Sequence, residues 1–246
     1  ISNDYLYHNI GDSVILYTQD GKVLKQEEVS SYPCVGEDRP GLRYFRSVRT
    51  TGLNENTVVA LFSARPLNTG TSYMKMWMPA SSDVSYFTAL APGAKTASSP
   101  YQNKPSLVVT MRKEKPAVKE PFVAVYEPIS DKVSAGLIES VDRVKLDPQG
   151  EEGCAIKVNT KEGDTFTLVN ILKDGPVILN NQKCCGDFAI FAKRKGKNSV
   201  YVGNGSFVEN KEFKVESENR GSFYMEYDQT SLLVRSNCPI KIQAKN

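Results

Sequence analysis

The chain has 246 residues, 40% of them hydrophobic and 24% charged, so it can bury a core and does not have the composition of a disordered protein. Its formal net charge of +3 is too small to indicate nucleic acid as a partner. Its apolar runs are too short to span a bilayer, so we expect no membrane partner either.

The elements predicted along the chain are short strands. Runs of β-prone residues alternate with turn residues such as Asp20-Gly21 and Asn204-Gly205, and no convincing amphipathic helix interrupts them. Two runs, 105–112 and 121–128, are bounded by prolines and are mostly apolar, which is typical of strands covered on both faces in the middle of a sheet. The predicted strands are 5–10, 14–18, 22–24, 42–50, 58–64, 72–78, 84–89, 105–112, 121–128, 134–144, 154–160, 165–172, 187–193, 199–202, 207–213, 222–227, 232–235 and 240–243.

These strands predict an all-β fold, a large two-layer antiparallel β-supersandwich with a smaller C-terminal β-sheet as an option. We expect residues 1–148 to form the main supersandwich, and residues 149–246 to continue it or to form a small second β-sheet domain. The composition changes at 147–153, which marks either a boundary or a loop. Because Ile1 lies just before a predicted strand, we expect the chain to be part of a longer protein.

Residues that bind metals are sparse in this sequence. The five cysteines contain no C-x-x-C spacing, and the single histidine, His8, cannot complete a zinc site with them. We therefore expect no metal and no other cofactor. Buried structural thiols and one or two disulfides both remain open for Cys34, Cys154, Cys184, Cys185 and Cys238.

His8 is the first candidate for chemistry, because general acid–base catalysis most often uses histidine. On a strand, Leu6 and His8 share one face, and Tyr5 and Tyr7 share the other. Two interpretations stay open, a hydrogen-bonded histidine beside the core and a ligand-facing histidine at the edge of a cleft.

The acidic residues are scattered, and nothing in their spacing proposes a carboxylate pair for glycoside hydrolysis.

A basic and aromatic segment lies at 43–49. On a strand, Arg43 and Arg49 would share a face with Phe45, while Arg46 would point the other way. Guanidinium groups suit the carboxylates or sulfates of an acidic polysaccharide, and a salt-bridged sheet surface is the alternative. A second basic run, 193–197, lies at a predicted hairpin tip, where solvated side chains are usual.

The chain's only tryptophan lies in the segment 73–78. On a strand, Tyr73, Lys75 and Trp77 share one face, and the three methionines share the other. One of the two faces should belong to the core. The face with Trp77 is then either a platform on which sugar rings stack or a packing surface.

Five short segments stand out together: 4–8 (DYLYH), 45–51 (FRSVRTT), 76–79 (MWMP), 86–92 (YFTALAP) and, above all, 121–128 (PFVAVYEP). In this order they resemble the β-sheet domain of the heparinase II/III-like polysaccharide lyases, and the resemblance covers residues 1–145. These enzymes cleave acidic polysaccharides by β-elimination, in which a base removes the C5 proton of a uronic acid. Most of their catalytic residues come from an α-helical toroid, and some members hold a zinc that this chain lacks the histidines to bind.

The resemblance implies the C-terminal β-supersandwich of a bacterial lyase that is periplasmic or secreted. It would pack on the N-terminal α-helical toroid of the same protein and form one wall of a cleft for an acidic polysaccharide or oligosaccharide, such as a glycosaminoglycan. We expect the chain alone to be inactive. The alternatives are a free-standing carbohydrate-binding or surface module, an intact hydrolase with a carboxylate pair, and a purely structural sheet domain.

The resemblance also bears on the candidate residues. His8 matches a family histidine and is predicted to line the cleft as the catalytic candidate. The predicted substrate-binding residues are Tyr7, Arg43, Arg49, Tyr73 and Trp77.

Overall fold

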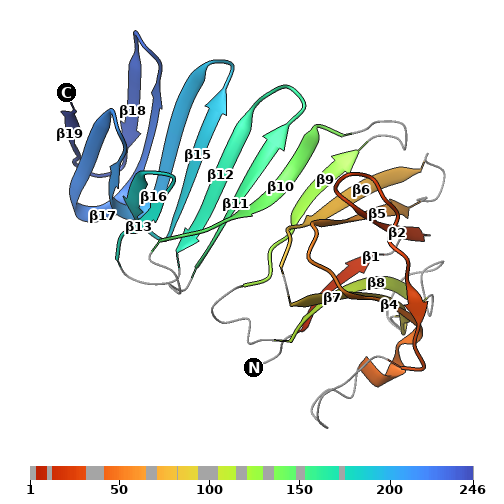
Figure 1. The fold of residues 1–246 in the computed structure, drawn as a ribbon. Helices are drawn as coiled ribbons and strands as arrows, with labels where there is room; N and C mark the ends of the chain where they lie inside the picture. The colour runs from red at the N-terminus through yellow and green to blue at the C-terminus, as the bar shows by residue number, and fades with distance from the viewer. Residues whose placement is uncertain are drawn as a thin grey trace. The chain divides into compact units, whose positions relative to one another are not determined.

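The computed structural model describes residues 4–9, 13–31, 42–64, 71–81, 83–93, 105–114, 121–129, 136–147, 153–171 and 175–245, with backbone alone for 4–9, 42 and 64. The fold is all-β with antiparallel sheets (Figure 1), which confirms the predicted fold class. The chain forms two compact units, Ile1–Ala117 with Phe122–Gly136, and Val118–Pro121 with Leu137–Asn246. The division into domains at 148 and 149 is not tested by these units and stays a prediction.

The first unit contains two sheets, with strand orders β1-β8-β7-β4-β3 and β2-β5-β6-β9. A 3-10 helix, η1 (Leu42–Tyr44), precedes β4. The strands are β1 (Asp4–Asn9), β2 (Ser13–Thr18), β3 (Glu27–Glu28), β4 (Arg46–Leu53), β5 (Val58–Ala64), β6 (Ser72–Met78), β7 (Val84–Ala91), β8 (Ser106–Lys113) and β9 (Val125–Ile129).

The two sheets of the first unit pack over a common hydrophobic core. Met76 and Met78 of β6 are fully buried, and they belong to one cluster with Tyr86 of β7 and Met111 of β8 from the other sheet. Because side chains alternate along a strand, Trp77 lies on the opposite face of β6 from this core. The sequence prediction that the methionine face and the tryptophan face are distinct is therefore correct.

The two predicted central strands that are bounded by prolines, 105–112 and 121–128, have different surroundings. The run 105–112 forms β8, an interior strand covered on both faces, since Val109 and Val108 belong to clusters on its two sides. The run 121–128 starts to pair only at Val125, and β9 is an edge strand. Its predicted place in the middle of a sheet is wrong. Pro128 fits β9 because an edge strand leaves one row of backbone groups unpaired.

The second unit is built on one ten-stranded sheet, the largest of the three. Its central path has the order β10-β11-β12-β15-β16-β14-β13, and β17 pairs with β16, β18 and β19. The strands are β10 (Ile138–Val144), β11 (Gly153–Thr160), β12 (Thr165–Ile171), β13 (Val177–Leu179), β14 (Gln182–Cys185), β15 (Phe188–Arg194), β16 (Lys197–Glu209), β17 (Phe213–Tyr227), β18 (Leu232–Ser236) and β19 (Lys241–Ala244).

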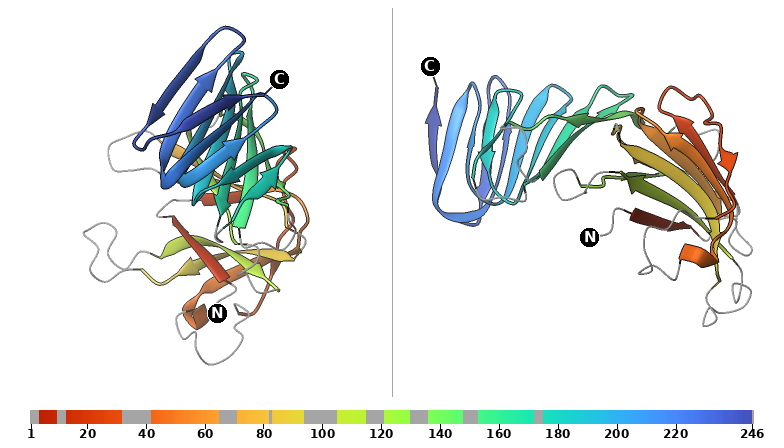
Figure 2. Two further views of the ribbon diagram at one scale, coloured as in Figure 1. Left: turned by 90° about the vertical axis from the view of Figure 1, so that its left-hand side faces the viewer. Right: turned by 60° about the horizontal axis from the view of Figure 1, so that its bottom comes forward.

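This sheet folds over itself into two layers because β16 and β17 each run through both (Figure 2). The first half of β16 pairs with β15 and its end pairs with β14, while β17 pairs first with β19 and then with β18. The ladder between β16 and β17 is irregular between Val202 and Phe207, which marks the corner. Buried apolar side chains from both layers form a single core.

The corner corrects one predicted turn. Asn204 adopts a positive φ of 47°, but β16 continues through Asn204 and Gly205 instead of reversing there. A Cβ on Gly205 would overlap a Val202 methyl and the carbonyl oxygen of Cys185, so only glycine fits at this point. The residues that favour a hairpin turn thus serve a bulge inside a long strand.

In the part of the chain that the structure describes, no helix has the length and apolar character needed to cross a membrane.

Candidate functional site

The first unit carries a hollow of about 660 Å³ at one end of its five-stranded sheet. This volume lies within the range of about 300–1,000 Å³ that is typical of ligand sites. Its walls come from η1, the start of β4, the end of β7 and the residue before β8. The lining residues are Arg43, Tyr44, Phe45, Arg46, Ser47, Leu90, Ala91, Pro92, Gly93 and Pro105.

Arg43 and Tyr44 form the exposed rim of this hollow. The guanidinium carbon of Arg43 lies 5.1 Å from the centre of the Tyr44 ring, and its Nη2 donates a hydrogen bond to Tyr44 Oη at 3.2 Å. Tyr44 is 55% exposed. Arg43 lies in η1 and not on a strand, so the strand face predicted for Arg43, Phe45 and Arg49 does not form.

Arg46 borders the hollow as well, at the start of β4. A β-bulge interrupts the pairing of β4 with β7 between Arg46 and Arg49, and Ser47 has a positive φ of 51° within it. The bulge breaks the simple alternation on which the sequence prediction rested, and both arginines are exposed while Val48 is buried. Arg46 lies opposite Leu90, which also lines the hollow.

Arg49 lies farther along β4, opposite Thr88 on one side and Glu28 on the other, and does not line the hollow. Among the residues that the structure describes, neither Arg46 nor Arg49 forms an ion pair. Both guanidinium groups therefore keep their donors for solvent or a ligand. A forked guanidinium beside an aromatic ring is suited to a carboxylate or sulfate carried on a sugar.

The sequence did not predict residues 90–93 or Pro105 as part of a binding site, although they line the hollow. They carry no local signal, because small and apolar residues at the ends of strands are common. Their part in the hollow follows from the pairing of β4 with β7 and of β7 with β8.

Trp77 lies beneath the surface of the first unit, with 4% of its area exposed. Its Nε1 donates a hydrogen bond to Glu127 Oε2 at 3.0 Å, and Lys75 Nζ lies 5.8 Å from the ring centre. Tyr73 is half-buried on the same strand. These contacts favour packing as the role of Trp77, and the predicted binding of glycan by Tyr73 and Trp77 stays a prediction.

Tyr17 gives the first unit a measurable response to alkaline pH. Burial, and then the negative charge of Glu127, raises the pKa of Tyr17 from 10.0 to about 12. A raised pKa in the folded state means that the associated stability is present below pH 10 and is lost as the pH rises toward 12.

We expect an ultraviolet difference titration of the wild type against Tyr17→Phe to show one phenol with a midpoint near pH 12. Circular dichroism at each pH limits the comparison to folded protein. If the phenol that Tyr17→Phe removes instead titrates near the ordinary tyrosine pKa of 10.0, Tyr17 is not in this environment.

His8 and Tyr7 lie on β1, opposite Val108 and Val109 of β8. The structure describes the backbone of β1 without its side chains. The catalytic role of His8 and the binding role of Tyr7 therefore stay predictions.

The buried carboxylates of the described ranges are held by other side chains. Such contacts fix them as parts of the scaffold, which gives no support to a hydrolytic carboxylate pair among them. The pairs are Asp83 with Lys113, Glu127 with Trp77, and Asp164 with Arg194.

Within the described residues, no three His, Cys, Asp or Glu side chains are grouped so as to hold a metal ion. Cys154, Cys184, Cys185 and Cys238 are free thiols, and Cys34 lies outside the described residues. Burial raises the pKa of the Cys184 thiol to about 12, so this thiol is poorly reactive at neutral pH.

Comparison with known proteins relates this all-β chain to the polysaccharide lyases. It is similar to the endo-acting ulvan lyase of Formosa agariphila, with 31% identity over 232 residues, which cover 90% of this chain and 28% of that enzyme. The chain thus spans about 28% of the length of its relative. No family model and no solved structure matches the chain, and the assignment to the heparinase II/III-like family stays a prediction.

Proposed function

We propose that this chain is a non-catalytic, polysaccharide-binding module of a larger lyase, and that its hollow holds an acidic sugar. The observation that carries the proposal is the combination of Arg43, Tyr44 and Arg46 at a hollow of about 660 Å³. A carboxylate or sulfate would bind the guanidinium groups, and the apolar face of a sugar ring would contact Tyr44. The similarity to an ulvan lyase supports a polysaccharide as the ligand and makes ulvan the first substance to test.

The rest of such a protein would supply the catalysis. We propose that an N-terminal α-helical toroid packs on this chain, as in the heparinase II/III-like lyases, and that His8 faces the cleft between them. The protein would act in the periplasm or outside the cell, where polysaccharides are met. A long helix-rich segment encoded directly before Ile1 would favour this arrangement, whereas its absence would favour a free-standing carbohydrate-binding module.

The test of the proposed function is calorimetric titration of the purified chain with ulvan, heparan sulfate, chondroitin and alginate. The double variant Arg43→Ala/Arg46→Ala should bind the preferred polysaccharide at least about tenfold more weakly, since hydrogen bonds to charged groups contribute about 1.5–3 kcal/mol each. The wild-type chain should leave the ultraviolet absorbance of unsaturated uronate unchanged with all four polysaccharides.

Lys22→Ala provides the matched control, because Lys22 is an exposed basic residue of the same unit that does not line the hollow. Its affinity should stay within about twofold of the wild type, since an isolated surface charge contributes little. Equal affinities of the wild type and the double arginine variant would remove the hollow from the proposal, and a clear rise in absorbance would show that the chain is itself a lyase.

A further inference from the structure

The second unit carries a row of exposed and half-buried side chains, most of them apolar or aromatic, across five strands. The strand register places Leu168 of β12 opposite Ile190 of β15, and Ile190 opposite Tyr201 of β16. Tyr201 in turn lies opposite Tyr224 of β17, which lies opposite Arg235 of β18. With strands about 4.8 Å apart, the row is about 19 Å long, which suits an oligosaccharide better than a single sugar.

This row lies on the face opposite the core. Val200 and Val202 are at most 2% exposed and belong to the core, while Tyr201 between them is half-buried on the other face. Leu168 is 38% exposed and the neighbouring Phe188 is 41% exposed. We call this surface the aromatic face and define it as Leu168, Phe188, Ile190, Tyr201, Tyr224 and Arg235.

Two rings of the aromatic face are in contact, and a third lies on the neighbouring strand. The ring centres of Phe188 and Tyr201 are 5.5 Å apart with their planes inclined by 38°. Tyr224 is the cross-strand partner of Tyr201 on the next strand, so the two side chains lie on the same face of the sheet. Flat rings with a polar edge match the apolar faces and the hydroxyl groups of sugars.

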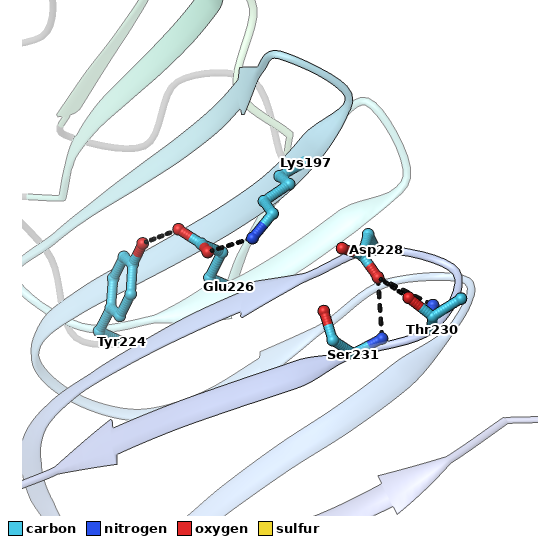
Figure 3. A network of polar contacts seen from close by, with 6 residues as sticks. All are labelled: Lys197, Tyr224, Glu226, Asp228, Thr230 and Ser231. Carbon is cyan, nitrogen blue, oxygen red and sulfur yellow. Dashed lines mark hydrogen bonds and ion pairs between the residues drawn. The ribbon is translucent and has the colours of Figure 1, made fainter.

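Polar contacts hold one edge of the aromatic face in place (Figure 3). Tyr224 Oη donates to Glu226 Oε2 at 3.0 Å, and Lys197 Nζ donates to Glu226 Oε1 at 3.2 Å. Asp228 accepts hydrogen bonds from the backbone N–H groups of Thr230 and of the next residue, each at 2.8 Å, and so closes the hairpin between β17 and β18. The edge is therefore ordered before any ligand arrives.

Arg235 supplies the charge of the aromatic face. It is exposed, and within the described ranges it forms no ion pair, in contrast to Lys197, which is paired with Glu226. A free guanidinium next to a tyrosine is complementary to an anionic group on a sugar.

We propose that the aromatic face is a second polysaccharide-binding surface, which takes an acidic oligosaccharide with its sugar rings on Phe188, Tyr201 and Tyr224 and an anionic group on Arg235. It shares the ligand class of the proposed function and in that respect rests on it. Its residues, however, belong to the second unit and are separate from those that line the hollow.

The experiment measures calorimetric binding of the preferred polysaccharide in the Arg43→Ala/Arg46→Ala background, where the hollow no longer contributes. Saturable binding should remain in this background. Adding Tyr201→Ala/Tyr224→Ala should weaken it at least about tenfold, because the apolar contact area is lost. Arg235→Gln should weaken it about fivefold or more, because a charge-assisted hydrogen bond is lost.

Three comparisons keep the result interpretable. Tyr201→Phe/Tyr224→Phe, which keeps the rings, should bind within about threefold of the background. Lys211→Gln, an exposed basic residue on the turn before β17, should bind as the background does. Arg235→Gln removes an exposed group that has no ion-pair partner among the described residues, so it tests the proposal even if the tyrosine-to-alanine variant does not fold.

The proposal is overturned if no binding remains once the hollow is removed, or if folded variants of the aromatic face bind unchanged. It is also overturned if light scattering shows that Tyr201→Ala/Tyr224→Ala dissociates an oligomer while polysaccharide binding is unaffected, since the face is then an interface between copies of the chain. Failure of the proposed function gives a different result, namely equal binding by the wild type and Arg43→Ala/Arg46→Ala.

Discussion

Replacing Asp83 with alanine is expected to lower the free energy of unfolding by about 3–5 kcal/mol, because removal of one partner from a buried ion pair takes away its compensation of the other buried charge. Lys113 Nζ lies 3.9 Å from Asp83 Oδ1, and the two side chains are 1% and 7% exposed. Ser81 Oγ donates to the same oxygen at 2.8 Å. Urea unfolding followed by the fluorescence of Trp77, the only tryptophan, reports on this unit.

Two variants test the cause of this loss. Asp83→Leu/Lys113→Met should recover much of the stability, because apolar replacement of both charges of a buried pair is often neutral. Glu226→Ala breaks a surface pair with Lys197, whose side chains are 34% and 53% exposed. Unfolding of Glu226→Ala followed by circular dichroism should show a loss of less than about 1 kcal/mol in the free energy of unfolding. A similarly small change for Asp83→Ala would contradict the assignment of a buried pair.

Replacing Gly205 with alanine is expected to destabilise the second unit by about 2–3 kcal/mol, the upper part of the range for overpacking. The new Cβ would overlap a Val202 methyl and the carbonyl oxygen of Cys185, and the carbonyl belongs to a paired strand that cannot move aside. Thermal unfolding followed by circular dichroism measures the effect.

Gly163→Ala is the control for this change. Its Cβ would meet nothing within 4 Å, but Gly163 has a positive φ of 83°, so the substitution introduces backbone strain without overlap. A loss of about 1 kcal/mol is expected, the lower end of the cost of a left-handed residue. If Gly205→Ala were no more destabilising than Gly163→Ala, the corner would not depend on close packing at Gly205.

Local sequence signals were sufficient for most of the strands. Alternation along 72–78 correctly separated the methionines from Trp77, and the predicted turns at 161–164 and 194–198 each contain the reversal between two paired strands. A hairpin between β13 and β14 was missed, although Asn180 and Asn181 both have the positive φ that a two-residue hairpin turn requires. The Asn-Asn pair was the available signal.

Features that depend on tertiary packing were not predictable in this way. Asn204-Gly205 favours a hairpin locally, but the layers on either side carry β16 through it. The residue types of 43–49 pointed to an acidic ligand, whereas the 3-10 turn at Arg43 and the bulge at Ser47 decide which side chains line the hollow. The aromatic face has no signature in any one strand, because it arises from the register of five.

The most direct test of the central claim, that the chain binds an acidic sugar at the hollow beside Arg43, is a nuclear magnetic resonance titration with an acidic oligosaccharide. The account predicts saturable shifts of the side-chain Nε–H signals of Arg43 and Arg46 and of the backbone signals of 90–93, which line the same hollow. The indole signal of Trp77, bonded to Glu127 and buried, should stay in place. Saturable binding that leaves the signals of the hollow unchanged would contradict the account.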